Sequence, residues 1–99
     1  MLAFLSYSHV DFKLKRRFVE HFAALQRLYG INLWHDDRLK EHAGQVLDSF
    51  IGQAITAAQL HLILVTPAMF NSDYIWNIEL PAMKESASVN NGLLVPIIL

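Results

Sequence analysis

The chain has 99 residues, of which 54% are hydrophobic and 17% are charged, with a formal net charge of −1 and no cysteine. This predicts one domain, residues 1–99, with a modest core, and gives no overall field for nucleic acid or an anionic membrane. The absence of cysteine excludes disulfides and thiolate chemistry and fits a cytoplasmic location, and no apolar run approaches the roughly 18 residues of a membrane span.

The start of the chain predicts a strand followed by a long helix. Residues 2–7 are mostly apolar, and Ser8 with Asp11 fits a capping box at the start of a helix over residues 11–29. Gly30 fits the position just after that helix. The apolar face is expected to consist of Leu14, Phe18, Phe22, Leu25 and Tyr29. The basic residues are expected on solvated faces: Lys13, Lys15, Arg16 and Arg17.

A short second strand is predicted over residues 31–34, and a polar loop follows over residues 35–44. The length and charge of this loop, and its position after a strand, make it a candidate binding loop. An ordinary connector explains the loop equally well. Residues 45–58 then repeat apolar groups at helical spacing, so a second helix is expected there.

Residues 60–80 contain the strongest structural signal and the main candidate for chemistry. Residues 60–65 are almost continuously apolar, as in a central parallel strand, and Pro67 ends the run. In an open α/β sheet, ligands bind beyond the carboxyl ends of the strands. Glu79 is an acid among large apolar groups just after such an end, so we expect it to carry the chemistry.

Pro81 constrains the helix that follows. Proline is tolerated in the first turn of a helix, but deeper in the helix it removes a hydrogen bond and clashes with the preceding turn. A regular helix is therefore expected to begin near residues 76–78, or to kink there. Either outcome places Glu79 in or near a first turn, where the helix dipole favours its ionised form. A turn is predicted at residues 90–92 and a last apolar strand at residues 93–99.

Strands and helices alternate strictly along the chain, which predicts an α/β fold with a parallel sheet and right-handed crossovers. The chain ends within an apolar strand, so we expect it to be truncated at the C-terminus. An uncovered strand of this kind is an aggregation liability, and we expect it to be stable only within a longer chain or an assembly.

Several kinds of functional site lack their sequence signals. The four glycines form neither a dinucleotide-binding motif nor a P-loop, and the five histidines show no zinc spacing, so no metal site is predicted. No nucleophile elbow surrounds any serine. A phosphoacceptor receiver domain would need an aspartate at the end of the third strand, where Thr66 and Pro67 stand, so we reject that interpretation.

Four short motifs, in this order and spacing over the whole chain, resemble those of TIR (Toll/interleukin-1 receptor) domains of the bacterial type. They are FLSYS at 4–8, WHDDR at 34–38 with Ala43 and Gly44, LVTP at 64–67 with Ser72 and Glu79, and VPII at 95–98. The resemblance implies a flavodoxin-like sheet with strand order 2-1-3-4 and helices on both faces. It also implies that a fifth strand and a last helix are absent from this chain.

The resemblance implies two functions, because some TIR domains cleave NAD+ at the nicotinamide–ribose bond and others act only in assembly. We therefore expect an NAD+ hydrolase or cyclase within a larger signalling or defence protein, activated by self-association into an oligomer or filament. The alternative is a non-catalytic scaffold for TIR–TIR assembly. NAD+ is then a substrate, no cofactor is needed, and this domain binds neither nucleic acid nor membrane.

The enzymatic TIR domains use a glutamate on the third helix, and Glu79 matches that position. The resemblance implies that the nucleotide pocket is lined by Tyr7, Ser8, His9, Asp36, Val46 and Trp76. Two positions depart from the family pattern. Ile75 stands four residues before Glu79, where an aromatic residue is frequent, and Ala43 stands where proline is usual before Gly44.

Overall fold

The computed structural model describes residues 1–35 and 45–98, with side chains for residues 51–98 of the second range. Asp36 and nearly all of the candidate binding loop therefore lie outside the described residues, and so does the side chain of Val46. The predicted roles of both residues stay predictions.

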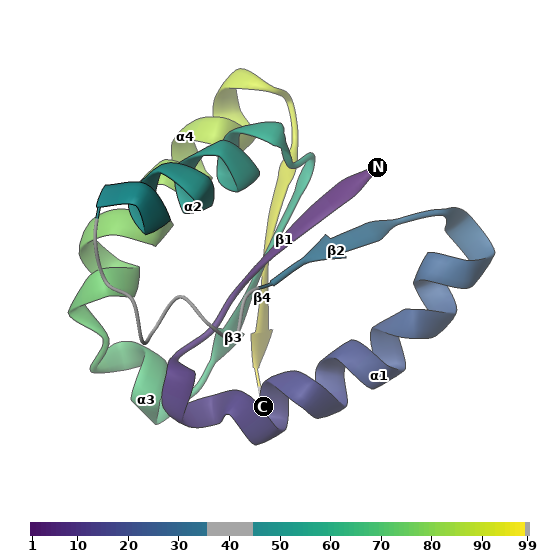
Figure 1. Ribbon diagram of the computed structural model, residues 1–99, viewed down its shortest axis with the longest axis horizontal. Helices are drawn as coiled ribbons and strands as arrows, with labels where there is room; N and C mark the ends of the chain where they lie inside the picture. The colour runs from purple at the N-terminus through teal and green to yellow at the C-terminus, as the bar shows by residue number, and fades with distance from the viewer. Residues whose placement is uncertain (36–44, 99) are drawn as a thin grey trace.

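Four parallel strands form one sheet in the order β2-β1-β3-β4 (Figure 1). The strands are β1 (Leu2–Ser6), β2 (Asn32–Trp34), β3 (Leu60–Val65) and β4 (Leu93–Ile98). This order confirms the flavodoxin-like arrangement. The chain passes from β1 to β2 on one side and later returns to β3 on the other, so β1 and β3 flank the topological switch point, where α/β sheets bind ligands.

Helices cover both faces of the sheet, as Figure 1 shows. One face carries α1 (Phe12–Tyr29), preceded by the short 3-10 helix η1 (His9–Asp11). The other face carries α2 (Gln45–Ala57), α3 (Pro67–Phe70), the π-helix η3 (Ile75–Glu79) and α4 (Leu80–Val89). The sheet therefore separates two hydrophobic layers, each built from one face of the strands.

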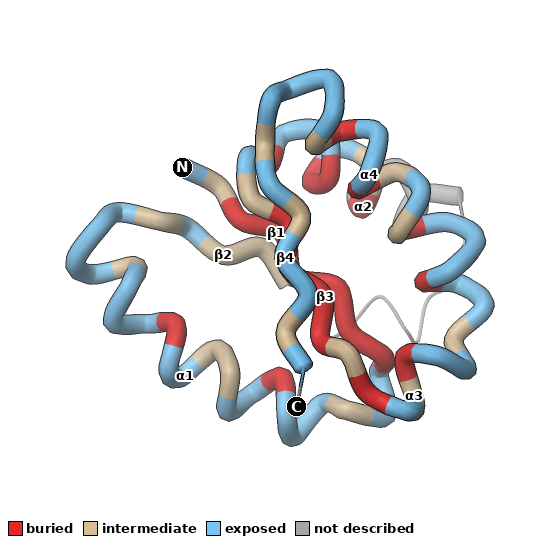
Figure 2. The backbone as a smooth tube through the Cα atoms, turned by 180° about the vertical axis from the view of Figure 1, so that it is seen from behind, coloured by how far each residue is buried: buried red, intermediate tan, exposed pale blue. Residues whose placement is uncertain are grey.

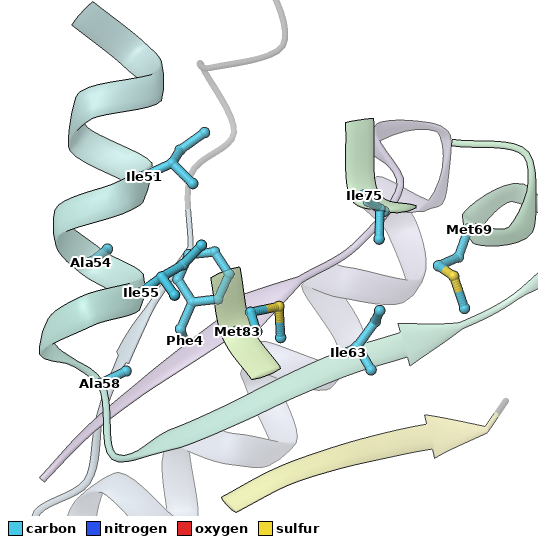
Figure 3. Packing of buried hydrophobic residues seen from close by; sticks show 9 residues of the cluster. All are labelled: Phe4, Ile51, Ala54, Ile55, Ala58, Ile63, Met69, Ile75 and Met83. Carbon is cyan, nitrogen blue, oxygen red and sulfur yellow. The ribbon is translucent and has the colours of Figure 1, made fainter. Parts of the chain in front are cut away.

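The layer under α2 and α4 forms the larger core. Because alternate residues of a strand point to opposite faces, Phe4 packs into this layer, while Ala3 and Leu5 pack toward α1. Phe4 lies beside Ile55 of α2 and Met83 of α4 (Figure 3). Full burial of a side chain of this size stabilises the fold by about 1.5–3 kcal/mol.

The inner face of α1 is rotated relative to the face that the sequence predicted. Phe22 is buried and Phe18 is half-buried, as expected. Three residues of the predicted inner face are exposed: Leu14, Leu25 and Tyr29. Lys15, expected in solvent, is only 4% exposed. The C-terminus of α1 is as predicted, because Gly30 adopts the left-handed conformation (φ 68°) and donates its N–H to the Gln26 carbonyl.

The helix after the polar turn contains a π-helical segment that the sequence did not predict. Leu80 donates its N–H to the carbonyl of Ile75, five residues back, and regular α-helix begins at Leu80 rather than at residues 76–78. Pro81 gives the physical reason, because a proline clashes with the carbonyl four residues before it, and the wider π turn relieves that clash. The expected start of regular helix at residues 76–78 was therefore wrong, and the kink expected as the other outcome stays a prediction.

Two glycines make a matched test of packing. A Cβ on Gly92 would lie 2.4 Å from the carbonyl oxygen of Gln59, which also accepts the N–H of Leu93. A Cβ on Gly52, within α2, meets no described atom within 4 Å. We expect Gly92→Ala to destabilise the fold by about 1–3 kcal/mol and Gly52→Ala to stabilise it by about 0.5–1 kcal/mol. Urea unfolding of both variants measures the difference, and equal effects would contradict the packing at Gly92.

His61, on β3, is buried in the layer under α2 and α4. It is fully inaccessible, and neither ring nitrogen has a hydrogen-bond partner among the described residues. Its ring lies 6.3 Å from that of Phe4, centroid to centroid. Burial away from water lowers the pKa of His61 from its ordinary value of 6.5, because the charged form is poorly solvated there.

This burial predicts a loss of stability in acid. Because the pKa of His61 is lowered in the folded state, the unfolded chain binds the proton first as the pH falls below 6.5. The contribution of His61 is therefore fully present above pH 6.5 and is lost below it, by at most about 1.4 kcal/mol per pH unit. Urea unfolding between about pH 7.5 and 5.5 should show a shallower pH dependence for His61→Leu than for wild type. His21→Leu, at an exposed site on α1, is the control and should behave as wild type.

Candidate functional site

A buried hydroxyl and a buried carboxylate meet at the carboxyl end of β1. Ser6 is the last residue of β1, and its hydroxyl donates a hydrogen bond of 2.7 Å to Oε1 of Glu79. Ser6 is 1% exposed and Glu79 is 5% exposed. The residue expected to carry the chemistry therefore lies at the edge of the sheet where α/β folds bind ligands.

The π-helix η3 places the side chain of Glu79 at this edge of the sheet. Ile75 and Glu79, four residues apart, are both buried, while the three residues between them are exposed. Ile75 packs with Met69 and Ile63 in the core (Figure 3). Ser6 shares the strand face of Phe4, which is the face toward α4. Glu79 and Ser6 thus approach each other from a helix and a strand on the same side of the sheet.

A second polar pair joins η1 to the end of β3. The Thr66 hydroxyl donates to a carboxylate oxygen of Asp11 and accepts the N–H of Met69 at 3.1 Å, which caps α3. The capping box predicted at Ser8 and Asp11 was wrong, since neither side chain makes a capping hydrogen bond. The Asp11 carboxylate binds Thr66 across 55 residues of sequence, a contact that local spacing does not encode.

Tyr7 lies on the opposite face of the sheet from Glu79. It is buried in the cluster under α1, with the Nζ atom of Lys15 5.5 Å from the centroid of its ring. The same Nζ atom lies 3.5 Å from Nδ1 of His35, at the end of β2. The sequence did not indicate the burial of Lys15, because a lysine on a helix is normally solvated.

The other predicted pocket residues lie in different surroundings. Ser8 is buried just after β1, and His9 is exposed at the start of η1. Trp76 is 41% exposed on the outer side of the π segment, and its indole N–H donates to the Phe70 carbonyl at 3.2 Å. The rings of Trp76 and Phe70 are stacked, with centroids 5.9 Å apart. The structure therefore brings Ser6, which the sequence did not single out, to Glu79 and turns Trp76 outward.

Within residues 1–35 and 45–98, no cluster of three or more His, Cys, Asp or Glu side chains has the arrangement of a metal site. No helix in the same part of the chain combines the length and the hydrophobicity that a membrane crossing requires. The fold and site define an open parallel α/β domain with a buried, hydrogen-bonded carboxylate at its topological switch point.

Comparison with known proteins shows the family. The family model for the TIR domain matches residues 3–99, and the chain belongs to that family. It is 32% identical over 96 residues to the uncharacterized protein y4lF of Sinorhizobium fredii, an alignment that covers 97% of this chain and 29% of that protein. The chain thus spans less than a third of the length of this relative.

The fold is also similar to a solved structure. The TIR domains of the activated Roq1 resistosome, which directly recognizes the pathogen effector XopQ, superpose with a TM-score of 0.71 at 21% identity. The match covers 98% of this chain and 56% of that chain. At this identity, the similarity supports the shared fold.

Proposed function

We propose that this TIR domain cleaves NAD+ at the nicotinamide–ribose bond, with Glu79 as the catalytic residue. The observation that carries the proposal is the buried carboxylate of Glu79, hydrogen-bonded to Ser6 at the carboxyl end of β1. The motif resemblance supports the same assignment, because Glu79 matches the glutamate that enzymatic TIR domains use on the third helix. The proposed setting is a larger cytoplasmic signalling or defence protein.

The chemistry requires one well-placed negative charge. As the bond between ribose C1′ and the pyridine nitrogen breaks, its electron pair leaves with nicotinamide, which departs as a neutral molecule and needs no general acid. The ribose becomes oxocarbenium-like, as in glycoside hydrolysis, and a carboxylate nearby stabilises the developing positive charge. Water then adds to C1′ and releases a proton to give ADP-ribose, while an internal nucleophile gives the cyclic product.

The burial of Glu79 links the proposed reaction to self-association. An exposed fraction of 5% keeps the carboxylate away from competing water and strengthens its electrostatic effect. The same burial leaves little room for a ribose to touch it in a single domain. The proposal therefore includes a rearrangement near the switch point when TIR domains assemble, which makes turnover depend on protein concentration.

A non-catalytic scaffold is the second candidate, and the apolar surface favours it. Four apolar side chains are between 47% and 73% exposed: Val10 in η1, Phe12 at the start of α1, and Leu28 and Tyr29 at its end. β4 exposes further apolar groups, and Figure 2 shows it as a largely exposed strand beside the buried β3. The edge of β4 that is unpaired in the described part of the chain, with its exposed apolar side chains, is the part of this surface that favours contacts between proteins.

Incubation of the full-length protein with NAD+ at several protein concentrations tests both candidates. Chromatography of the products distinguishes nicotinamide with ADP-ribose from nicotinamide with cyclic ADP-ribose, and light scattering reports the particle size of the same samples. Turnover per domain that rises with assembly supports the enzyme. Assembly without nicotinamide release supports the scaffold and contradicts the NADase proposal.

A further inference from the structure

The hydrogen bond between Ser6 and Glu79 joins two polar groups that are 73 residues apart in sequence and almost inaccessible to water. Burying a hydroxyl or a carboxylate is unfavourable unless each finds a partner. The pair therefore depends on correct placement of both the end of β1 and the π segment.

The strand itself has no packing need for a serine at this position. The three preceding residues, Ala3, Phe4 and Leu5, are apolar and no more than 2% exposed. Interior strand positions favour β-branched and aromatic side chains, which fill space without a polar group. The Ser6 hydroxyl is thus explained by its contact with Glu79 rather than by the core.

A hydroxyl in this place has two effects on a glutamate. An O–H···O bond to a carboxylate is stronger when the carboxylate is ionised, so the donor favours the charged form. The donor is also fixed by a central strand, and it restricts a side chain that otherwise has several rotatable bonds. Both effects preorganise the charge, which is the property that electrostatic catalysis requires.

We propose that Ser6 is the positioning residue of Glu79, holding its carboxylate ionised and oriented toward the nicotinamide ribose. The contact with ribose rests on the function proposed above. The effect of Ser6 on the charge and orientation of Glu79 does not rest on that function, and it is measured without turnover.

The test compares Ser6→Ala with a matched control at Ser86. Ser86 of α4 is 7% exposed, and its hydroxyl donates to the Ile55 carbonyl at 2.9 Å and accepts from Nδ2 of Asn90 at 3.2 Å, so Ser86→Ala also loses a buried hydroxyl and its hydrogen bonds. In the full-length protein we expect kcat for NAD+ to fall about tenfold to a hundredfold in Ser6→Ala with little change in KM. The acid limb of its pH–rate profile should move to higher pH. Ser86→Ala should lower the melting temperature comparably and keep a normal kcat.

Partial rescue separates a donor effect from a general loss of structure. Ser6→Cys keeps nearly the same size and replaces the hydroxyl with a weak S–H donor, so its kcat should lie between those of wild type and Ser6→Ala. Equal losses of kcat in Ser6→Ala and Ser86→Ala, or an unmoved acid limb, would overturn the positioning role.

A carbon-13 NMR titration of the Glu79 carboxyl, identified by its absence in Glu79→Gln, provides the readout that needs no substrate. Loss of the donor should move this titration to higher pH in Ser6→Ala and leave it unchanged in Ser86→Ala. If wild type releases no nicotinamide but the titration moves, the NADase proposal fails while the positioning of Glu79 stands. An unmoved titration overturns the positioning, whatever the turnover.

Discussion

Replacing Glu79 with glutamine is expected to reduce NAD+ turnover by about a hundredfold to a thousandfold, equivalent to about 3–4 kcal/mol of transition-state stabilisation. Glutamine keeps the size of the side chain, and its carbonyl still accepts the hydrogen bond from Ser6, but the negative charge is lost. The melting temperature and the assembly of the protein should therefore change little. Initial rates of nicotinamide release, measured with melting curves and particle size, test all three expectations.

Glu85 provides the matched control for this substitution. It lies on α4, six residues after Glu79, and is exposed to solvent. Glu85→Gln removes the same charge from the same region and should leave turnover unchanged. Equal rates in wild type and Glu79→Gln would show that Glu79 takes no part in the reaction. Equal losses of rate in Glu79→Gln and Glu85→Gln would show that only the overall negative charge of this region matters.

The largest expected loss of stability comes from Phe4→Ala, about 3–5 kcal/mol. Phe4 is 1% exposed at the centre of the core, and its ring stacks on that of Trp34 with centroids 5.2 Å apart. Truncation to alanine removes this contact and leaves a cavity between β1, α2 and α4. A loss of this size is a large fraction of the total stability of a small domain, about 5–15 kcal/mol, so urea unfolding should show a much lower midpoint.

Phe12→Ala is the control with the same change of side chain. Phe12 begins α1 and is 47% exposed, with the guanidinium carbon of Arg16 6.0 Å from the centroid of its ring. Its truncation creates no buried cavity and should cost less than about 1 kcal/mol. Similar losses in Phe4→Ala and Phe12→Ala would contradict the placement of Phe4 in the core.

The parts of the fold that depend on local patterns were predictable from the sequence. The apolar run of β3 marked a strand buried on both faces, and Gly30 marked the end of α1. The strand order came from the resemblance to the family rather than from periodicity, because parallel strands with similar apolar runs do not specify their own neighbours. The position of Glu79 at the sheet edge followed from its place just after the carboxyl end of the apolar run at residues 60–65.

The parts that depend on distant contacts were not predictable. The sequence pattern predicts that Lys15 lies on the surface. It is buried because the inner face of α1 is rotated, which brings Lys15 to Tyr7 and His35. The local sequence predicts that Asp11 caps a helix, but its carboxylate accepts a hydrogen bond from Thr66 instead. Trp76 is three residues before Glu79 and in a regular helix would lie near it, but the π turn places it outside. Each difference arises where a tertiary contact overrides a local preference.

The central position of β1 has a consequence for how the chain folds during synthesis. β1 pairs with β3 from Ala3 opposite Leu60. The edge of β1 that faces β3 therefore has no partner strand until 57 further residues have been synthesised. At about 5–20 residues per second, the wait is about 3–11 seconds. During that time the emerging N-terminal half exposes apolar strand without its partner, and the closure of so long a loop makes its pairing slow. The side of β1 that faces β3 therefore stays uncovered until β3 has left the ribosome, and the contact between Ser6 and Glu79 cannot form before residue 79 has been made.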